Sequence, residues 1–155
     1  MIKILYPGRV SPIKDVPTLV QAVRILHLKL IINNSYTYNE IPKLFRSADL
    51  IVVPTLSKAL DKVFLEALIC GVPAIGSDLG YPFMTTKFPQ LIFEAGNPRD
   101  LAQKIKWLVN HPQQTRKIVL SAQQFVRKNF DLENLIDKIV VEFEKNDVFV
   151  RGGSI

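Results

Sequence analysis

Short apolar runs alternate with amphipathic segments along the chain. The runs at residues 2–6, 28–33, 50–53, 72–76 and 91–93 have the length and the composition of strands buried in a parallel sheet. Between and after them, apolar residues recur at helical spacing, at 16–28, 39–47, 62–70, 98–110, 113–128 and 133–145. This alternation predicts an α/β fold with a mostly parallel sheet.

Residues with strong end preferences mark the limits of several of these helices. Pro17 suits a first helical turn, and Asp61 stands where it can cap the helix predicted at 62–70. Gly71 is placed to end that helix, and Asn97 to begin the next one. These local signals give the predicted helices definite boundaries.

Length and composition fit a globular domain that folds by burying a core, because 48% of the 155 residues are hydrophobic and 22% are charged. No apolar run approaches the roughly 20 residues that cross a bilayer. The first eight residues are too short for the apolar part of a secretion signal, so we expect a cytoplasmic protein. Without repeats or linkers, we expect one domain over residues 1–150 and a frayed tail at 151–155.

The net charge of +6 favours anionic partners: nucleotide phosphates, anionic lipid head groups or nucleic acid. The basic residues are spread along the chain without interleaved aromatics, so we expect no specific nucleic-acid binding, while peripheral contact with a membrane stays open. The single cysteine, Cys70, lies in an apolar stretch without a nearby cysteine or histidine. We therefore predict a buried cysteine and no metal site.

The first candidate for chemistry follows the strand predicted at 2–6 and leads into a helix. In open α/β sheets, ligands bind at the carboxyl ends of the strands. There Arg9 and Lys14 can bind a diphosphate from two sides, Arg9 through its planar guanidinium group and Lys14 through its ammonium charge. The alternative is that both are solvated surface cations.

The second candidate covers residues 57–71, a loop after the strand predicted at 50–53 and the helix that follows. The free N–H groups and partial positive charge of a helix start suit phosphate oxygens. Glu66 lies one turn further along an otherwise apolar helix. It is either the polar edge of that helix or a carboxylate that accepts hydrogen bonds from a ribose diol.

A series of short motifs spans most of the chain. In order they are Gly8-Arg9, Ser11-Pro12, Lys14, Leu19, Ala22, Ala48-Asp49-Leu50, Pro54, Leu65-Glu66-Ala67, Gly71-Val72-Pro73, Ile75, Asp78-Leu79-Gly80, Gly96-Asn97-Pro98 and Leu101-Ala102. Together they resemble the donor-binding domain of family 4 glycosyltransferases. The resemblance implies the C-terminal half of a GT-B fold, a Rossmann-like parallel sheet flanked by helices. It also implies retaining transfer of a sugar from a nucleotide-diphosphate sugar, without a metal or other cofactor.

The resemblance further implies a donor-binding set, which comprises Gly8, Arg9, Lys14, Lys58, Asp61, Lys62, Val63 and Glu66. In it, Arg9 and Lys14 hold the diphosphate, and Glu66 holds the ribose. The backbone at Lys62 and Val63 faces the phosphates. Catalysis would rest on electrostatic stabilisation of the departing diphosphate.

Two positions depart from the family pattern. Lys58 replaces a glutamate that contacts the donor sugar, and a cation cannot accept hydrogen bonds from sugar hydroxyls. Asp61 replaces a glycine, and its side chain would cap the N–H groups meant for phosphates, although Lys62 can offset its charge. Two interpretations stay open: a variant active site, in which Asp61 is a candidate catalytic residue, or an inert remnant that at most binds nucleotides.

The chain is also shorter than the pattern. Residues 28–35 stand where the family has a further strand and helix, a unit of about 30 residues, so we expect the sheet to lack one βα unit. No segment resembles the N-terminal half of a GT-B enzyme. We therefore expect the acceptor to be held by a separate N-terminal domain.

Overall fold

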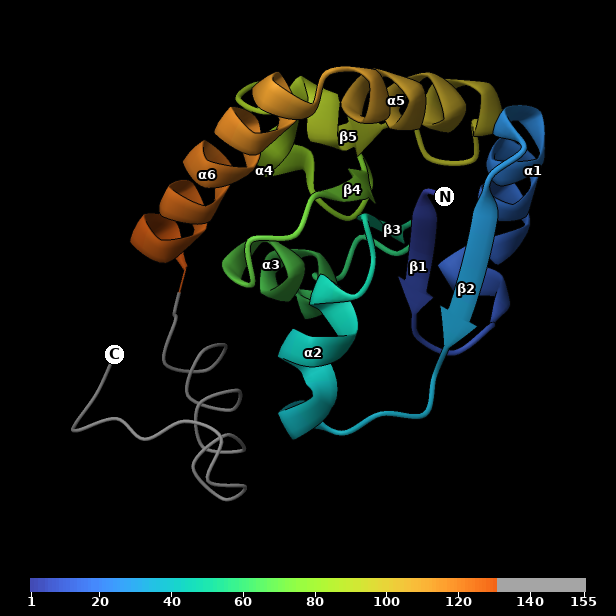
Figure 1. Ribbon diagram of the computed structural model, residues 1–155, viewed down its shortest axis with the longest axis horizontal. Coiled ribbons are helices and arrows are strands. Elements are labelled where there is room, and N and C mark those ends of the chain that lie inside the picture. Colours follow the sequence, from blue (N-terminus) through green and yellow to red (C-terminus); the bar gives the residue numbers. More distant parts are fainter. Residues whose placement is uncertain (131–155) are drawn as a thin grey trace.

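Five parallel strands form the centre of the computed structural model, which describes residues 1–130 (Figure 1). The strands are β1 (Lys3–Pro7), β2 (Lys29–Asn33), β3 (Leu50–Val53), β4 (Ala74–Ser77) and β5 (Ile92–Phe93). Their order in the sheet is β2-β1-β3-β4-β5, and every neighbouring pair is parallel. The predicted α/β, Rossmann-like fold is confirmed.

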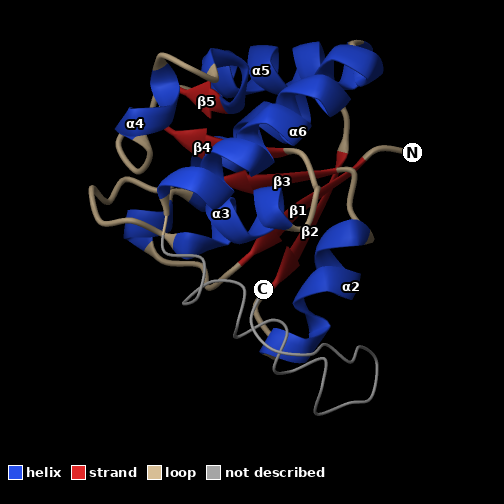
Figure 2. Ribbon diagram, turned by 90° about the vertical axis from the view of Figure 1, so that its left-hand side faces the viewer, coloured by secondary structure: helices blue, strands red, loops and turns tan. Residues whose placement is uncertain are grey.

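Helices flank the sheet (Figure 2). They are α1 (Val16–Leu26), α2 (Ile41–Arg46), α3 (Lys62–Ile69), α4 (Pro82–Thr85), α5 (Pro98–Asn110) and α6 (Pro112–Asn129). Short 3₁₀ turns are η1 (Pro12–Lys14), η2 (Tyr38–Glu40) and η3 (Pro89–Leu91). The helix α5 packs on α1, and α6 packs on α3, so α5 and α6 form an arch along one side of the molecule (Figure 1).

The predicted helix ends are confirmed where local chemistry sets them. The Asp61 side chain accepts a hydrogen bond from the N–H of Val63, and Asn97 caps α5 in the same way. Gly71 follows α3 with a φ of 76°, in the left-handed region that glycine adopts at little cost. The predicted helix at 133–145 and the tail at 151–155 lie outside the described residues.

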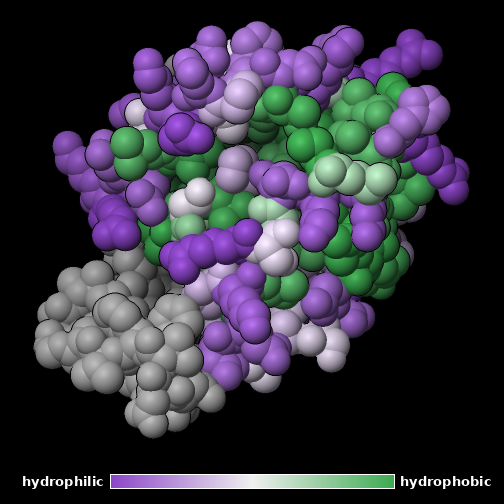
Figure 3. Space-filling view, viewed as in Figure 1, coloured by the Kyte–Doolittle hydropathy of each residue, from purple (hydrophilic) through white to green (hydrophobic). Residues whose placement is uncertain are grey.

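The strand order agrees with the prediction that one βα unit is missing. A doubly wound Rossmann sheet has the order 3-2-1-4-5-6, and the observed order matches it without the outermost strand. The strand β2 is therefore an edge, and its Ile32 is 45% exposed. Figure 3 shows hydrophobic side chains on this side of the molecule and a largely hydrophilic surface along the arch of α5 and α6.

Part of the core lies where α3 covers β3 and β4. Every residue of these two strands is buried. The Phe64 ring of α3 lies 4.3 Å from the Tyr81 ring, centroid to centroid, and both side chains are fully buried. Tyr81 fills the space beside Gly76, where an added Cβ would lie 2.3 Å from the Cδ2 atom of Tyr81. This packing fixes the start of α3 against the end of β4.

Cys70 is buried at the end of α3, as predicted. Burial raises the pKa of its thiol to about 11. A thiol with that pKa is almost wholly protonated near neutral pH and therefore a poor nucleophile.

Candidate functional site

The two candidate segments meet at the carboxyl-terminal edge of the sheet. The loop after β1 contains η1, and the loop after β3 covers residues 54–61. The N–H of Leu56 donates a 2.8 Å hydrogen bond to the carbonyl oxygen of Ile13. This bond joins the two loops directly, although they are far apart in the sequence.

Buried hydroxyl groups hold the loop after β3 against β4. The Oγ atom of Ser77 donates a 2.6 Å hydrogen bond to the carbonyl oxygen of Thr55 and accepts one of 3.2 Å from the N–H of Gly80. The Thr55 hydroxyl accepts a 3.0 Å bond from the N–H of Ser57. The two bonds of Ser77 are buried and therefore shielded from water, and they give the loop a defined position.

Lys14 and Asp61 form an ion pair across the two loops. The Nζ atom of Lys14 lies 2.8 Å from Oδ2 of Asp61, and Oδ1 of Asp61 accepts a 3.0 Å bond from the N–H of Val63. The Lys14 and Asp61 side chains are 34% and 18% exposed. One carboxylate thus binds both a cation and the first turn of α3.

This arrangement differs from the sequence-based expectation that Lys62 would offset the charge of Asp61. Lys62 is the first residue of α3 and is exposed, and within residues 1–130 it forms no ion pair. The neighbouring position in the sequence therefore does not supply the counterion. The loop after β1 does, through Lys14.

Two tyrosines line the same edge and were not predicted as site residues. The hydroxyl of Tyr6 donates a 2.8 Å hydrogen bond to the carbonyl oxygen of Arg9, and that of Tyr36 donates a 3.4 Å bond to Pro7. Burial, and after it the charge of Asp61, raises the pKa of Tyr6 to about 12. The sequence gives no direct signal for either residue, because Tyr6 belongs to an apolar strand and Tyr36 to a polar loop.

Glu66 is 7% exposed on α3, so it is not the solvated edge of that helix. Burial, then the charges of Glu66 and Asp61, raise the pKa of Tyr36 to about 12. Both carboxylates therefore act electrostatically on the same phenol.

The remaining predicted residues fall into two groups. The N–H of Gly8 bonds to the carbonyl oxygen of Asn33 at 3.0 Å, which joins the ends of β1 and β2 beside the site. Arg9 and Lys58 are exposed, and neither forms an ion pair within the described part of the chain. The structure therefore brings Lys14, Asp61 and Val63 into direct contact and buries Glu66 on the same helix, α3, while the side chains of Arg9, Lys58 and Lys62 are exposed.

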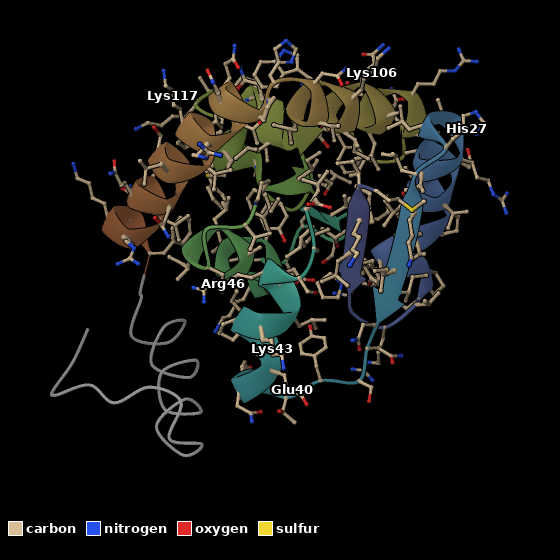
Figure 4. All side chains as sticks on the ribbon, viewed as in Figure 1. His27, Glu40, Lys43, Arg46, Lys106 and Lys117 are labelled. Atoms are coloured by element: carbon tan, nitrogen blue, oxygen red, sulfur yellow. The ribbon has the colours of Figure 1, made fainter. Side chains whose placement is uncertain are left out.

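The basic side chains are distributed over the molecule. Figure 4 shows Lys43 and Arg46 close together on α2, and Lys106 on α5 and Lys117 on α6 at the opposite side of the protein. Within residues 1–130, no helix is long and apolar enough to cross a membrane, and no group of three or more His, Cys, Asp or Glu side chains is placed to hold a metal ion.

Solved structures with the same fold come from glycosyltransferases. The catalytic domain of the cholesterol-α-glucosyltransferase from Helicobacter pylori has a TM-score of 0.71 at 18% identity, over 83% of this chain and 99% of that one. The C-terminal domain of a glycosyl transferase group 1 family protein from Francisella tularensis has a TM-score of 0.73 at 15% identity, over 84% and 87%. HepE from Anabaena, solved with UDP, has a TM-score of 0.70 at 19% identity, over 93% of this chain and 49% of that one.

Two curated relatives match by sequence. An uncharacterized glycosyltransferase of Methanocaldococcus jannaschii is 25% identical over 117 residues, which are 74% of this chain and 33% of the relative. The D-inositol 3-phosphate glycosyltransferase of Rhodococcus erythropolis is 26% identical over 112 residues, 71% of this chain and 25% of the relative. This chain thus spans a third or less of the length of these proteins.

The sequence pattern of one family covers more than half of the chain, residues 31–111. The matched part includes β3, the loop that carries Asp61, and α3 with Glu66. The fold is that of the C-terminal domain of a GT-B enzyme, as the resemblance implied. The chain belongs to the family of glycosyl transferases group 1.

Proposed function

We propose that this chain is the donor-binding half of a glycosyltransferase that moves a sugar from a nucleotide-diphosphate sugar to an acceptor. The observation that carries this proposal is the contact of Lys14 with Asp61 at the N-terminus of α3, at the carboxyl edge of the sheet, in a chain of this family that also buries Glu66 on α3. Ligands of open α/β folds bind at that edge. Retention of the anomeric configuration is part of the proposal and comes from the family resemblance.

Each group has a role that its chemistry supports. Arg9 and Lys14 bind the diphosphate, and the N–H groups at the start of α3 add a partial positive charge beside it. Glu66 accepts hydrogen bonds from the ribose hydroxyls. Uracil nucleotides are the first ligands to test, because the similar HepE of Anabaena was solved with UDP and with UDP-glucose.

The reaction itself would depend on electrostatic stabilisation. As the bond between the sugar and the diphosphate breaks, negative charge grows on the departing phosphate oxygens, and preorganised cations and N–H groups stabilise it. Arg9, Lys14 and the start of α3 supply such groups without a metal or another cofactor. Lys58 supplies a cation where the family pattern has a glutamate, so we expect the contacts to the sugar to differ from that pattern.

A partner domain is part of this proposal, and exposed apolar side chains on the two loops support it. Val10 and Ile13 in the first loop are 62% and 51% exposed, and Leu56 and Leu60 in the second are 41% and 44% exposed. An acceptor-binding N-terminal domain that closes over the site would bury them. We further propose that the protein acts in the cytoplasm, with contact to an anionic membrane surface as a secondary possibility.

A second candidate function is an inert nucleotide-binding module of the same fold. Two features favour it. Lys58 stands where the family pattern has a carboxylate that contacts the sugar, and Lys14 is already paired with Asp61. This candidate predicts nucleotide binding without sugar transfer. Restoring the glutamate with Lys58→Glu would then add no affinity for the nucleotide sugar over the free nucleotide.

Isothermal titration calorimetry with UDP, GDP, ADP and their glucose conjugates tests the donor site. We expect binding of at least one nucleotide, weakened by Arg9→Ala and by Glu66→Ala and unchanged by Lys117→Ala, a cation on the arch. Absence of binding up to millimolar concentrations would refute the proposal. Binding without transfer, when a family N-terminal domain and an acceptor are supplied, would favour the inert module.

A further inference from the structure

The carboxylate of Asp61 already makes the contacts that the proposed function assigns to a phosphate. One oxygen lies 2.8 Å from the ammonium group of Lys14, and the other accepts a 3.0 Å hydrogen bond from the N–H of Val63 in the first turn of α3. An anion between a cation and a helix start is the arrangement in which proteins hold phosphate groups. Here the anion belongs to the chain itself.

A capping role alone does not account for this geometry. A helix cap needs one side-chain oxygen on a backbone N–H, and Oδ1 of Asp61 fulfils it. The second oxygen binds a lysine 47 residues away in the sequence, on a different loop. The carboxylate therefore neutralises a cation that would otherwise be available to a ligand.

The backbone of Asp61 is held in place. The hydroxyl of Tyr81 donates a 2.7 Å hydrogen bond to the Asp61 carbonyl oxygen, and the Tyr81 ring is fully buried against Phe64. Movement of the whole loop would break this packing. To release Lys14 and the N–H of Val63, the Asp61 side chain has to rotate about its own bonds.

We propose, on the basis of the donor-binding function above, that Asp61 is an internal anion that occupies one phosphate subsite and so sets the phosphate specificity of the site. In the native chain, Lys14 and the N–H of Val63 are already bound to Asp61 and are not available to the second phosphate of a nucleoside diphosphate. The negative charge of Asp61 also repels that phosphate. The native site therefore distinguishes poorly between nucleoside mono- and diphosphates. A clear preference for the diphosphate appears when the charge of Asp61 is removed.

The test compares UMP with UDP, GMP with GDP and AMP with ADP on the native chain and on Asp61→Asn. Asparagine caps a helix as well as aspartate does, so this change removes the charge and keeps the cap. Asp61→Ser is a second capping variant, in case the first does not fold. The control is Asp49→Asn. Asp49 lies at the amino-terminal ends of the strands, away from the site, and its carboxylate accepts a hydrogen bond from the N–H of Lys3.

We expect Asp61→Asn to tighten diphosphate binding about tenfold or more, because hydrogen bonds to charged groups are strong, while monophosphate binding changes little. The control should leave both affinities unchanged. A variant that binds both phosphates as the native chain does, or more weakly, would overturn the inference and leave the donor-binding function intact. If neither the native chain nor the variant binds any nucleotide, the donor-binding function fails together with the inference.

Discussion

The side-chain hydroxyl of Ser77 donates a 2.6 Å hydrogen bond to the carbonyl oxygen of Thr55. Ser77 ends β4 and Thr55 lies in the loop after β3, so this bond ties the end of β4 to the loop that carries Asp61. The Thr55 backbone also leads to Leu56, whose N–H bonds to Ile13 in the other loop. The relative position of Lys14 and Asp61 thus depends on a buried serine that neither of them touches.

Ser77→Ala should destabilise the protein by about 1–3 kcal/mol, because it leaves a buried carbonyl oxygen and a buried N–H without their partner. It should also weaken nucleotide binding, since the loop over β4 loses its fixed position. Thermal denaturation and calorimetry measure the two effects. The control is Ser47→Ala, which removes an exposed hydroxyl bonded to Leu44 and should change neither quantity appreciably.

Gly76→Ala tests the packing at the start of α3. The added methyl group would lie 2.3 Å from Tyr81 and 3.2 Å from Phe64, and the rings are too closely packed to withdraw. We expect a loss of about 1–3 kcal/mol in the free energy of unfolding, as for other overpacked cores. The loss should be smaller in a Tyr81→Ala background, where the space is open. An equal loss in both backgrounds would show that the clash is not with Tyr81.

The tyrosines at the site make stability depend on alkaline pH. The pKa of both Tyr6 and Tyr36 is raised to about 12, from about 10 in an unfolded chain. Since the folded state holds these protons more tightly, their contribution to stability is complete below pH ~10 and is lost as the pH rises towards 12. Urea denaturation at increasing pH should show this loss. Tyr6→Phe should make stability less dependent on pH in that window, and an unchanged dependence would contradict the assignment.

Local chemistry made much of the fold predictable. Asp61, Asn97 and Gly71 mark helix ends through interactions with their immediate neighbours, so their roles can be inferred without tertiary information. The four-residue helix α4 could not be found in this way, because it is shorter than two helical turns and shows no periodicity.

The candidate site was less predictable, because its contacts join distant segments. The sequence singled out Lys14 and Asp61 separately, each as a phosphate-site residue, but their ion pair depends on how the loops after β1 and β3 meet. From its position in the sequence, Lys62 was the expected counterion of Asp61. In the structure Lys62 is the first residue of α3, and its side chain is exposed. Tyr36 follows β2, and its hydroxyl reaches the carbonyl oxygen of Pro7 because β2 stands beside β1 in the sheet.

The proposed ribose contact of Glu66 can be tested with modified nucleotides. If its carboxylate accepts hydrogen bonds from both ribose hydroxyls, the native chain should bind UDP about tenfold more tightly than 2′,3′-dideoxy-UDP. Glu66→Gln should reduce this preference, while Glu40→Gln, on the exposed η2 turn, should keep it. Equal affinities of the native chain for the two nucleotides would remove Glu66 from the ribose site.

The measurement that tests the central claim most directly is calorimetric titration of the native chain with UDP, GDP and ADP, repeated with Arg9→Ala and Lys117→Ala. Arg9 stands on the loop at the proposed diphosphate site, and Lys117 stands near the start of α6, on the arch (Figure 4). The account predicts saturable binding of at least one nucleotide, weakened by Arg9→Ala and unaffected by Lys117→Ala. No heat of binding at millimolar nucleotide, or equal losses in the two variants, would contradict it.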